Sequence, residues 1–386
     1  MVSSEDLHVP QQKNFKRLVR ARMAKTGESY TTARSRFVPP PAATPRPLVD
    51  PDAGALARAL AEVTNPLTGE PYSPELLFGL GGGIGFGYFV FAYTGLTTFS
   101  VDGRFNALYF DKKGSVEAAC ARLGIPVRIQ QLSTVESAEK RVRQVLDAAP
   151  EALLTVDLTR VPGQDTPDDW PYLPYPVTVS AQGPDLAVTG LPGGTRTMAW
   201  PELLDARWMH AKKYGGLYVF GPPGGVDVRS AVLAAVERTA GCLLEPGRGT
   251  FDSNVGVPGM RKWARLLTDP RDPKGWPKLC ADPESLGRAL AAVVWGLGRA
   301  DPSATAHRRL YAAFLDQAAA LVEKPALAEV ATAYRELGAR WAELVGLAEQ
   351  PGATGADLAV HLSELADAEE STATVLRAAV REGAAR

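Results

Sequence analysis

The spacing of hydrophobic residues changes once along the chain, at about residue 225. From about 72 to 225, short apolar segments with strand-like spacing alternate with segments of helical spacing. After about 226 the strand-like segments cease, and long segments with helical spacing follow one another. Short helices that precede a run of closely spaced strands are typical of helices packed on one sheet. The pattern therefore predicts an α+β domain followed by an all-helical domain.

In the first region the pattern predicts both helices and strands. The expected helical ranges are 52–62, 74–93 (with a glycine turn), 116–123, 136–148 and 202–207. The expected strands are 105–110, 127–132, 152–158, 177–181, 186–190, 196–199 and 216–220. Asp50 is expected to cap the first helix, with Pro51 in its first turn, because a short acceptor side chain followed by proline favours a helix start. Turn residues between the later strands favour a mostly antiparallel ending.

The second region predicts six helices, at 228–240, 257–267, 284–297, 305–322, 325–347 and 356–384. The fifth carries an apolar seam with steps of 3, 4, 3, 4 and 3 residues, formed by Leu327, Val330, Tyr334, Leu337, Trp341 and Leu344. Such a seam is typical of a helix that buries one face. We interpret it as one face of a helical bundle rather than as a dimeric coiled coil.

The N-terminal segment differs in composition from the rest. Residues 13–36 hold eight basic residues and one acid, with apolar residues near helical spacing, which predicts a basic amphipathic helix. One interpretation is a helix docked on an acidic face of its own protein or of a sister subunit in a homodimer. The other is a clamp on nucleic acid, an anionic partner or an acidic carrier protein. The candidate partner-binding residues are Lys13, Lys16, Arg17, Arg20 and Arg22.

Six prolines in 38–51 predict an extended linker between this arm and the folded body. The expected organisation is therefore a basic arm (1–37), a linker (38–51), an α+β domain (52–225) and a helical domain (226–386). The chain as a whole has a net charge of −1, which argues against a general nucleic-acid binder. Residues 13–36 carry +7, however, so the remainder carries −8 and forms a mildly acidic body.

Composition also bears on location. Three scattered cysteines among 386 residues argue against a disulfide framework and favour a reducing, cytoplasmic compartment. The N-terminus shows no apolar segment of a secretory signal. Residues 76–101 contain no charge but seven glycines, so a buried glycine turn is favoured there over a membrane span. We expect no membrane association.

The most specific motif is the glycine run 79–88. Its backbone N–H groups could face a phosphate or an oxyanion, or the glycines could serve close packing in a core, and the residues alone do not decide between these roles. The run lacks the Lys-Ser/Thr of a Walker loop, and no convincing strand precedes it as in a dinucleotide site. The candidate substrate-binding residues are Gly81, Gly82, Gly83, Gly85 and Tyr88.

Catalytic and metal motifs are otherwise weak. The three cysteines, Cys120, Cys242 and Cys280, fall at apolar helical or loop positions, where a structural role is favoured. The four histidines show no metal-ligand spacing. We therefore expect neither a metal nor a cofactor.

Several segments together resemble the butirosin biosynthesis protein H (BtrH) N-terminal family and the helical region that usually follows it. The most specific match is EPYSPELLFGLGGGIGFGYF at 70–89, followed by LTVDLTRVP at 154–162. Softer matches in the helical region are NVGVPGMRKWARLLTDP, KGWP and RLYAAFL, which begin at Asn254, Lys274 and Arg309. The resemblance covers roughly 50–325.

The resemblance implies a papain-like cysteine-peptidase-type fold and acyltransferase chemistry. The founding member moves an aminoacyl group from a carrier-protein thioester to an amine of an antibiotic. That chemistry requires a thiolate at a helix N-terminus and a histidine on a facing strand. Here the helix begins Asp50-Pro51-Asp52 and the strand begins Pro174-Tyr175-Pro176, so neither nucleophile nor histidine is present.

The acids and phenol expected around that cleft are the remaining acid/base candidates. Asp157 matches the acid that follows the family's central strand, and Asp50, Asp52 and Tyr175 should line the same cleft. The leading hypothesis is a biosynthetic, acyltransferase-like protein that acts on a carrier-tethered or activated small-molecule acyl group without a covalent cysteine intermediate. The alternatives are a catalytically degenerate pseudoenzyme acting as a binding or assembly subunit, and a DNA-associated regulator that uses the basic arm.

Overall fold

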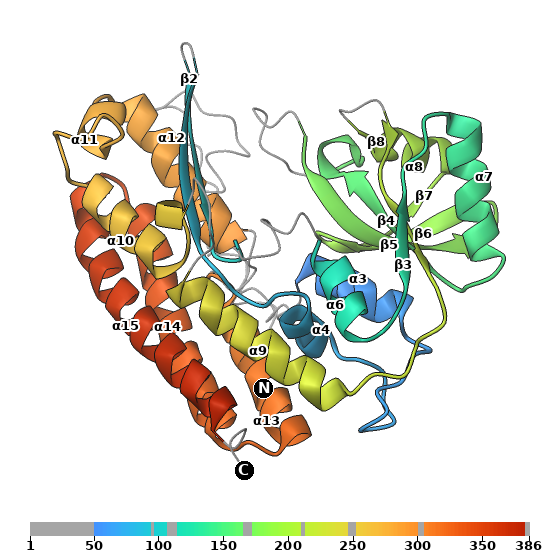
Figure 1. Cartoon of the computed structure of the whole chain (residues 1–386). Helices are drawn as coiled ribbons and strands as arrows, with labels where there is room; N and C mark the ends of the chain where they lie inside the picture. The colour runs from blue at the N-terminus through green and yellow to red at the C-terminus, as the bar shows by residue number, and fades with distance from the viewer. Residues whose placement is uncertain are drawn as a thin grey trace, which may run out of the picture. The chain divides into compact units, whose positions relative to one another are not determined.

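The computed structural model describes residues 50–93, 96–105, 114–164, 172–209, 213–245, 252–299 and 305–382 (Figure 1). The chain divides into two compact units, Met1–Pro47 and Leu48–Arg386, and every described residue belongs to the second. The expected basic arm, with Lys13, Lys16, Arg17, Arg20 and Arg22, lies outside the described residues, as does most of the expected strand 105–110.

The described part of the chain is mixed α/β, with a sheet followed in sequence by helices. Six strands form an antiparallel sheet in the order β3-β10-β4-β5-β6-β7. Their bounds are β3 Val127–Gln130, β4 Ala152–Asp157, β5 Pro174–Gln182, β6 Asp185–Leu191, β7 Gly194–Met198 and β10 Leu217–Phe220. A short hairpin joins β8 Trp208–Met209 to β9 Lys213–Tyr214. The antiparallel meander expected from the turn residues is therefore observed in β5, β6 and β7.

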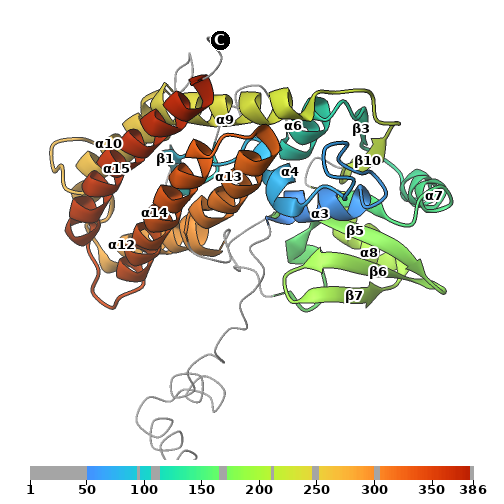
Figure 2. The ribbon, with the colours of Figure 1, turned by 90° about the horizontal axis from the view of Figure 1, so that it is seen from below.

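Two sets of helices pack on the two faces of this sheet (Figure 2). On one face, α7 (Val135–Leu146) and α8 (Trp200–Arg207) bury alternate residues of β4 and β5, including Leu154 and Val177. On the other face lies α3 (Pro51–Ala59), which contacts β4, β5 and β6. Arg58 of α3 donates from Nε to Oγ1 of Thr178 at 2.9 Å. Because side chains alternate along a strand, Thr178, Pro176 and the opposing Thr155 share the α3 face.

The glycine-rich segment departs from its expected form. Helix α4 (Pro74–Leu80) ends where Gly82 and Gly83 adopt positive φ angles of 108° and 62°. The chain then forms an antiparallel hairpin of β1 (Gly87–Tyr93) and β2 (Leu96–Asp102). The expectation of a helical stretch through residue 93 is therefore wrong. Two left-handed glycines stop the helix, and the aromatic and β-branched residues that follow suit a strand.

All elements described after residue 226 are helical (Figure 1). They are α9 Val228–Leu244, α10 Gly256–Leu266, α11 Trp276–Leu279, α12 Pro283–Val294, α13 Arg308–Val322, α14 Ala326–Ala348 and α15 Gly355–Arg381. Short 3-10 turns at Leu158–Arg160 and Asp252–Asn254 and a π-helical turn at Trp295–Arg299 complete the described elements, together with α6 at Ser115–Arg122. All six residues of the apolar seam in α14 are buried.

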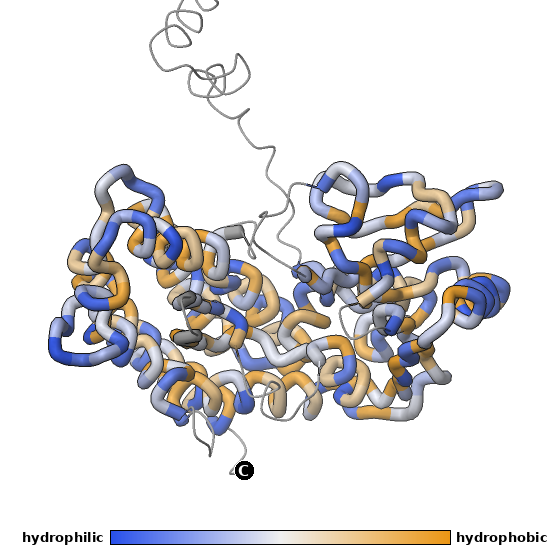
Figure 3. The backbone as a smooth tube through the Cα atoms, turned by 90° about the horizontal axis from the view of Figure 1, so that it is seen from above, coloured by the Kyte–Doolittle hydropathy of each residue, from blue (hydrophilic) through white to orange (hydrophobic). Residues whose placement is uncertain are grey.

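One apolar cluster links the two regions. It contains buried residues of α3, α4 and α6 together with residues of α9, α10, α13, α14 and α15. Apolar and polar positions alternate along the helices accordingly (Figure 3). Within the residues that the structure describes, no helix is both long enough and apolar enough to cross a membrane.

Candidate active site

The N-terminus of α3 carries two carboxylates, those of Asp50 and Asp52. Asp50 is the N-cap residue, and its Oδ1 accepts a hydrogen bond from the Ala53 N–H at 2.9 Å. Pro51 occupies the first turn, as the sequence predicts, and Asp52 follows it. Asp50 is buried, whereas the Asp52 side chain is 36% exposed. The start of the helix therefore uses Asp50 as a buried capping residue and leaves Asp52 partly exposed.

Arg104 joins both carboxylates. Its Nη1 is paired with Asp50 Oδ2 and lies 3.5 Å from Asp52 Oδ2. The guanidinium also stands over the ring of Phe78, 4.7 Å from its centroid. Its Nη2 atom is buried and makes no hydrogen bond to the described residues. One N–H group of Arg104 is therefore available for an anionic or carbonyl group next to Asp52.

Ser115 contacts Asp52 from the first residue of α6. Its Oγ donates to Asp52 Oδ2 at 2.5 Å. Desolvation and the nearby carboxylate of Asp50 raise the pKa of Asp52, and Arg104 and the Ser115 hydrogen bond oppose this rise in part. A carboxyl group with a raised pKa exchanges its proton more readily near neutral pH than an ordinary aspartate, which suits acid/base chemistry.

The sheet supplies a phenol that interacts electrostatically with Asp52. Tyr218 lies on β10 and belongs to the partly buried residues around the α3-side cluster. Burial and the charge of Asp52 raise the pKa of Tyr218 to about 12, although a hydrogen bond with Thr155 of β4 opposes the rise. The phenol is therefore protonated at neutral pH and can act as a hydrogen-bond donor.

Together these groups are suited to proton transfer next to the carbonyl group of a substrate. Asp52 can accept or donate a proton, Tyr218 can donate a hydrogen bond, and Arg104 can hold negative charge. Pro176, on the sheet face toward α3, can do none of these. No described histidine or cysteine contacts Asp52 in the interactions observed. The site thus contains acid/base groups and no cysteine–histidine dyad among its described residues.

Asp157 and Tyr175 are placed elsewhere. Asp157 is buried at the end of β4, and its Oδ1 accepts hydrogen bonds from Thr159 N, Thr159 Oγ1 and Leu173 N at 3.1, 2.8 and 3.0 Å. The Tyr175 ring packs against the cluster on the sheet face opposite α3. The structure therefore does not bring either residue together with Asp52. Asp157 holds the turn after β4, and Tyr175 packs against the cluster beneath α7 and α8, where its phenol still interacts electrostatically with Arg58 of α3.

The glycine turn uses its own backbone donors. The N–H groups of Gly81, Gly82, Gly83 and Gly85 donate to backbone carbonyl oxygens at 2.7, 3.1, 3.0 and 3.1 Å. A Cβ on Gly83 would lie 2.8 Å from the ring of Tyr311. Of the two roles left open by the sequence, the geometry favours close packing, because all four donors are already paired with backbone carbonyl oxygens.

Tyr88, the last candidate of the glycine run, is also part of the core. It is buried, its ring stacks on Trp263 at 5.5 Å, and its hydroxyl accepts a hydrogen bond from Trp276 Nε1 at 2.9 Å. Burial raises its pKa well above the usual value for a phenol. These contacts join β1 to α10 and α11 rather than to the carboxylates of α3.

Two of the described cysteines, Cys120 and Cys280, are unsuited to nucleophilic catalysis. Burial, with Glu117 nearby, raises the pKa of Cys120 to about 12, and burial raises that of Cys280 to about 11. Thiols with such pKa values hold almost no thiolate at neutral pH. Within the described residues, no three acidic, histidine or cysteine side chains form a group suited to a metal ion.

Three residues of the site were not singled out from the sequence, namely Arg104, Ser115 and Tyr218. Tyr218 lies in an expected strand, and Ser115 precedes an expected helix, so that periodicity placed their elements correctly. Nothing in the local pattern indicates that they meet at Asp52, since 52, 104, 115 and 218 are far apart in the chain.

Family models account for most of the described chain. The model described as butirosin biosynthesis protein H, N-terminal, matches residues 52–190. A second model, described as a domain of unknown function (DUF4872), matches residues 202–376. No curated protein matches the chain. The first match begins at Asp52 and includes α3, the glycine turn and β4–β5, and the second includes α9 to α14. The chain therefore belongs to the BtrH-like family, with a DUF4872 domain after its N-terminal domain.

Proposed function

We propose that the protein is a biosynthetic acyltransferase-like enzyme that transfers or cyclises an activated acyl group by direct attack of an amine. The observation that carries the proposal is the raised pKa of Asp52, which accepts a hydrogen bond from Ser115 and faces Arg104 at the N-terminus of α3. The match to the butirosin biosynthesis protein H N-terminal model supports a biosynthetic role. The resemblance to that family implies acyl transfer from a carrier-tethered thioester and a papain-like arrangement of a central helix against a sheet.

The residues then take distinct roles in one balanced step. The amine nitrogen attacks the thioester carbonyl, a C–N bond forms and the C–S bond breaks. The Asp52 carboxylate accepts the proton that the amine loses and passes it to the departing thiolate. The Tyr218 hydroxyl donates a hydrogen bond to the carbonyl oxygen as negative charge develops there, and Arg104 orients an anionic part of the substrate.

The test is turnover of acyl-carrier thioesters or acyl thioesters with amines, followed by intact mass spectrometry. We expect amide or cyclised product with the wild-type protein and a loss of at least 100-fold with Asp52→Asn, because one general base contributes about 10²–10⁴-fold. Asp147→Asn is the matched control, since Asp147 is exposed at the end of α7 and should leave turnover unchanged.

The second candidate is a pseudoenzyme that binds the acyl ligand or assembles with a partner. It is favoured by Pro176, which presents no proton acceptor on the sheet face toward α3. Absence of product across a broad panel of thioesters and amines would refute the enzyme proposal. Ligand binding without turnover that is lost in Arg104→Met would then support the binding role.

A further inference from the structure

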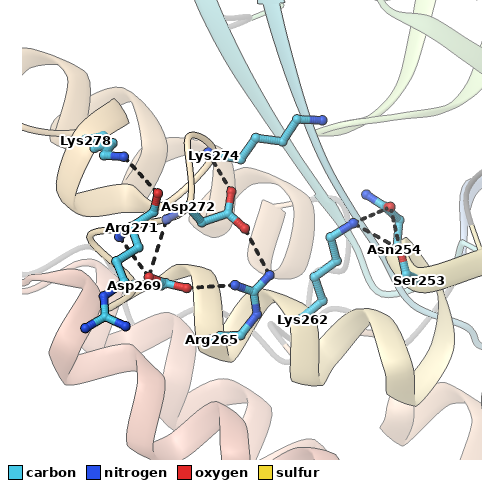
Figure 4. Close-up of polar contacts among 9 residues, drawn as sticks. All are labelled: Ser253, Asn254, Lys262, Arg265, Asp269, Arg271, Asp272, Lys274 and Lys278. Atoms are coloured by element: carbon cyan, nitrogen blue, oxygen red, sulfur yellow. Dashed lines mark hydrogen bonds and ion pairs between the residues drawn. The ribbon is translucent and has the colours of Figure 1, made fainter.

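Five cations gather where α10 leads into α11 (Figure 4). They are Lys262, Arg265, Arg271, Lys274 and Lys278. Two carboxylates, Asp269 and Asp272, lie among them, so that the cluster has a net charge of +3. The cluster shares no residue with the carboxylate site at α3, and its chemistry is independent of the proposed acyl transfer.

The two carboxylates are fully occupied by other groups. Asp269 Oδ2 and Asp272 Oδ2 accept from the two terminal nitrogens of Arg265 at 2.8 and 3.1 Å. Asp269 Oδ1 accepts from the Arg271 N–H, and Asp272 Oδ1 accepts from the Lys274 N–H, each at 2.8 Å. These bonds hold the pKa of both carboxyl groups below the usual value. The acids therefore shape the loop and form their ion pairs with Arg265 rather than with a lysine of the cluster.

Lys262 is held in place without an acidic partner. Its Nζ donates to Ser253 Oγ at 3.0 Å and to Asn254 Oδ1 at 2.9 Å. Asn254 is itself fixed, because its Nδ2 donates to the Tyr88 carbonyl at 2.7 Å. Partial burial and the positive charges of Lys274 and Arg265 lower the pKa of Lys262, and the more weakly acting carboxylate of Asp272 opposes them. The ammonium group is therefore preoriented, and neighbouring cations disfavour its charge.

Lys274 completes the arrangement. It is exposed, and Figure 4 draws no contact from its ammonium group to the other residues shown. Neither Lys274 nor Lys262 belongs to an ion pair with a described residue. Lys274 nevertheless lies close enough to disfavour the charge of Lys262. Two neighbouring ammonium groups that form no ion pair with a described residue suit a ligand with two negative charges better than a single carboxylate.

We propose that Lys262 and Lys274 bind the phosphate group of a phosphate-bearing small molecule, with Ser253 beside it as a neutral hydrogen-bonding group. A phosphate dianion compensates both ammonium charges and offers each an acceptor oxygen. The third donor of Lys262 remains free after its bonds to Ser253 and Asn254. The site is thus a phosphate-binding site on the helical region, formed by α10 and the loop that follows it.

The first experiment is titration of the full chain with inorganic phosphate and with glycerol 3-phosphate, followed by calorimetry at constant ionic strength. We expect saturable binding of both. Each of Lys262→Met and Lys274→Met should weaken binding about tenfold, which corresponds to about 1.4 kcal/mol. Lys140→Met is the matched control, because Lys140 is exposed on α7 and outside the cluster, and it should not change the affinity.

A second measurement needs no variant. Acetylation of lysines with a reactive ester at pH 8, read by peptide mass spectrometry, should modify Lys262, Lys274 and Lys140 in the absence of phosphate. Phosphate should protect Lys262 and Lys274 and leave Lys140 unchanged. Equal effects of phosphate and chloride, or phosphate binding that survives both substitutions, would overturn the proposal. Binding of duplex DNA that phosphate does not displace would also overturn it.

Discussion

Substitution of Glu369 by glutamine tests the buried ion pair that ties the glycine turn to the helices. Arg308 of α13 and Glu369 of α15 are both fully buried, and Arg308 Nε donates to Glu369 Oε1 at 2.6 Å. Trp341 Nε1 donates to the same oxygen at 2.7 Å. Glutamine is close to glutamate in volume, and its carbonyl oxygen can accept both hydrogen bonds. The substitution therefore removes the negative charge without opening a cavity.

The cost follows from the charge left behind. Removing one partner of a buried ion pair costs about 3–5 kcal/mol, because the other charge remains buried. Arg308 keeps three carbonyl acceptors, on Gly85, Gly103 and Ala306, at 3.0, 2.7 and 2.8 Å. These dipoles offset part of the penalty, so we expect a loss of about 3 kcal/mol. At about 2 °C per kcal/mol for a chain of this size, Tm should fall by about 6 °C.

The assay compares Glu369→Gln with Glu370→Gln by thermal unfolding and hydrogen exchange. Glu370 is the next residue of α15 and pairs with the exposed Arg261, so its loss should cost less than about 1 kcal/mol. The Gly85 amide, which donates to the Gly103 carbonyl, should exchange faster in Glu369→Gln alone. Equal Tm values for the two variants would refute the reasoning, because they would show that carbonyl dipoles alone compensate the Arg308 charge.

Three further predictions concern the site, the glycine turn and the thiols. Because the pKa of Asp52 is raised in the folded protein, its protonated carboxyl group contributes stability below pH 3.8, and this contribution is lost as the pH rises through the folded-state pKa. Asp52→Asn should therefore have a higher Tm than the wild-type protein at pH 7 but not at pH 3.5. A Cβ on Gly79 would lie 2.2 Å from an aromatic ring, so Gly79→Ala should cost about 1–3 kcal/mol in thermal unfolding. The helical control Gly241→Ala, which meets nothing within 4 Å, should be neutral or stabilising. Cys120 and Cys280 should resist iodoacetamide at pH 8 until the protein unfolds, and rapid alkylation of the native protein, measured by mass spectrometry, would contradict their burial.

The sequence by itself determined many of the local elements and indicated the family. Helix starts depend on interactions within one turn, and accordingly Asp50 and Pro51 begin α3 as predicted. The apolar seam of α14 is buried, since a period near 3.6 places its members on one face. The glycine motif identified the family correctly, because it is a contiguous pattern that needs no knowledge of the fold.

The tertiary structure decided what these local patterns do. The segment after Gly83 is a strand rather than a helix, because β2 pairs with it and supplies the hydrogen bonds. The donors of the glycine turn are satisfied by backbone carbonyls, a role that local composition cannot distinguish from ligand binding. The candidate site exists only because Asp52, Ser115 and Tyr218 meet across distant parts of the chain. Their proximity depends on how α3 and α6 pack beside the sheet, and no local periodicity encodes that packing.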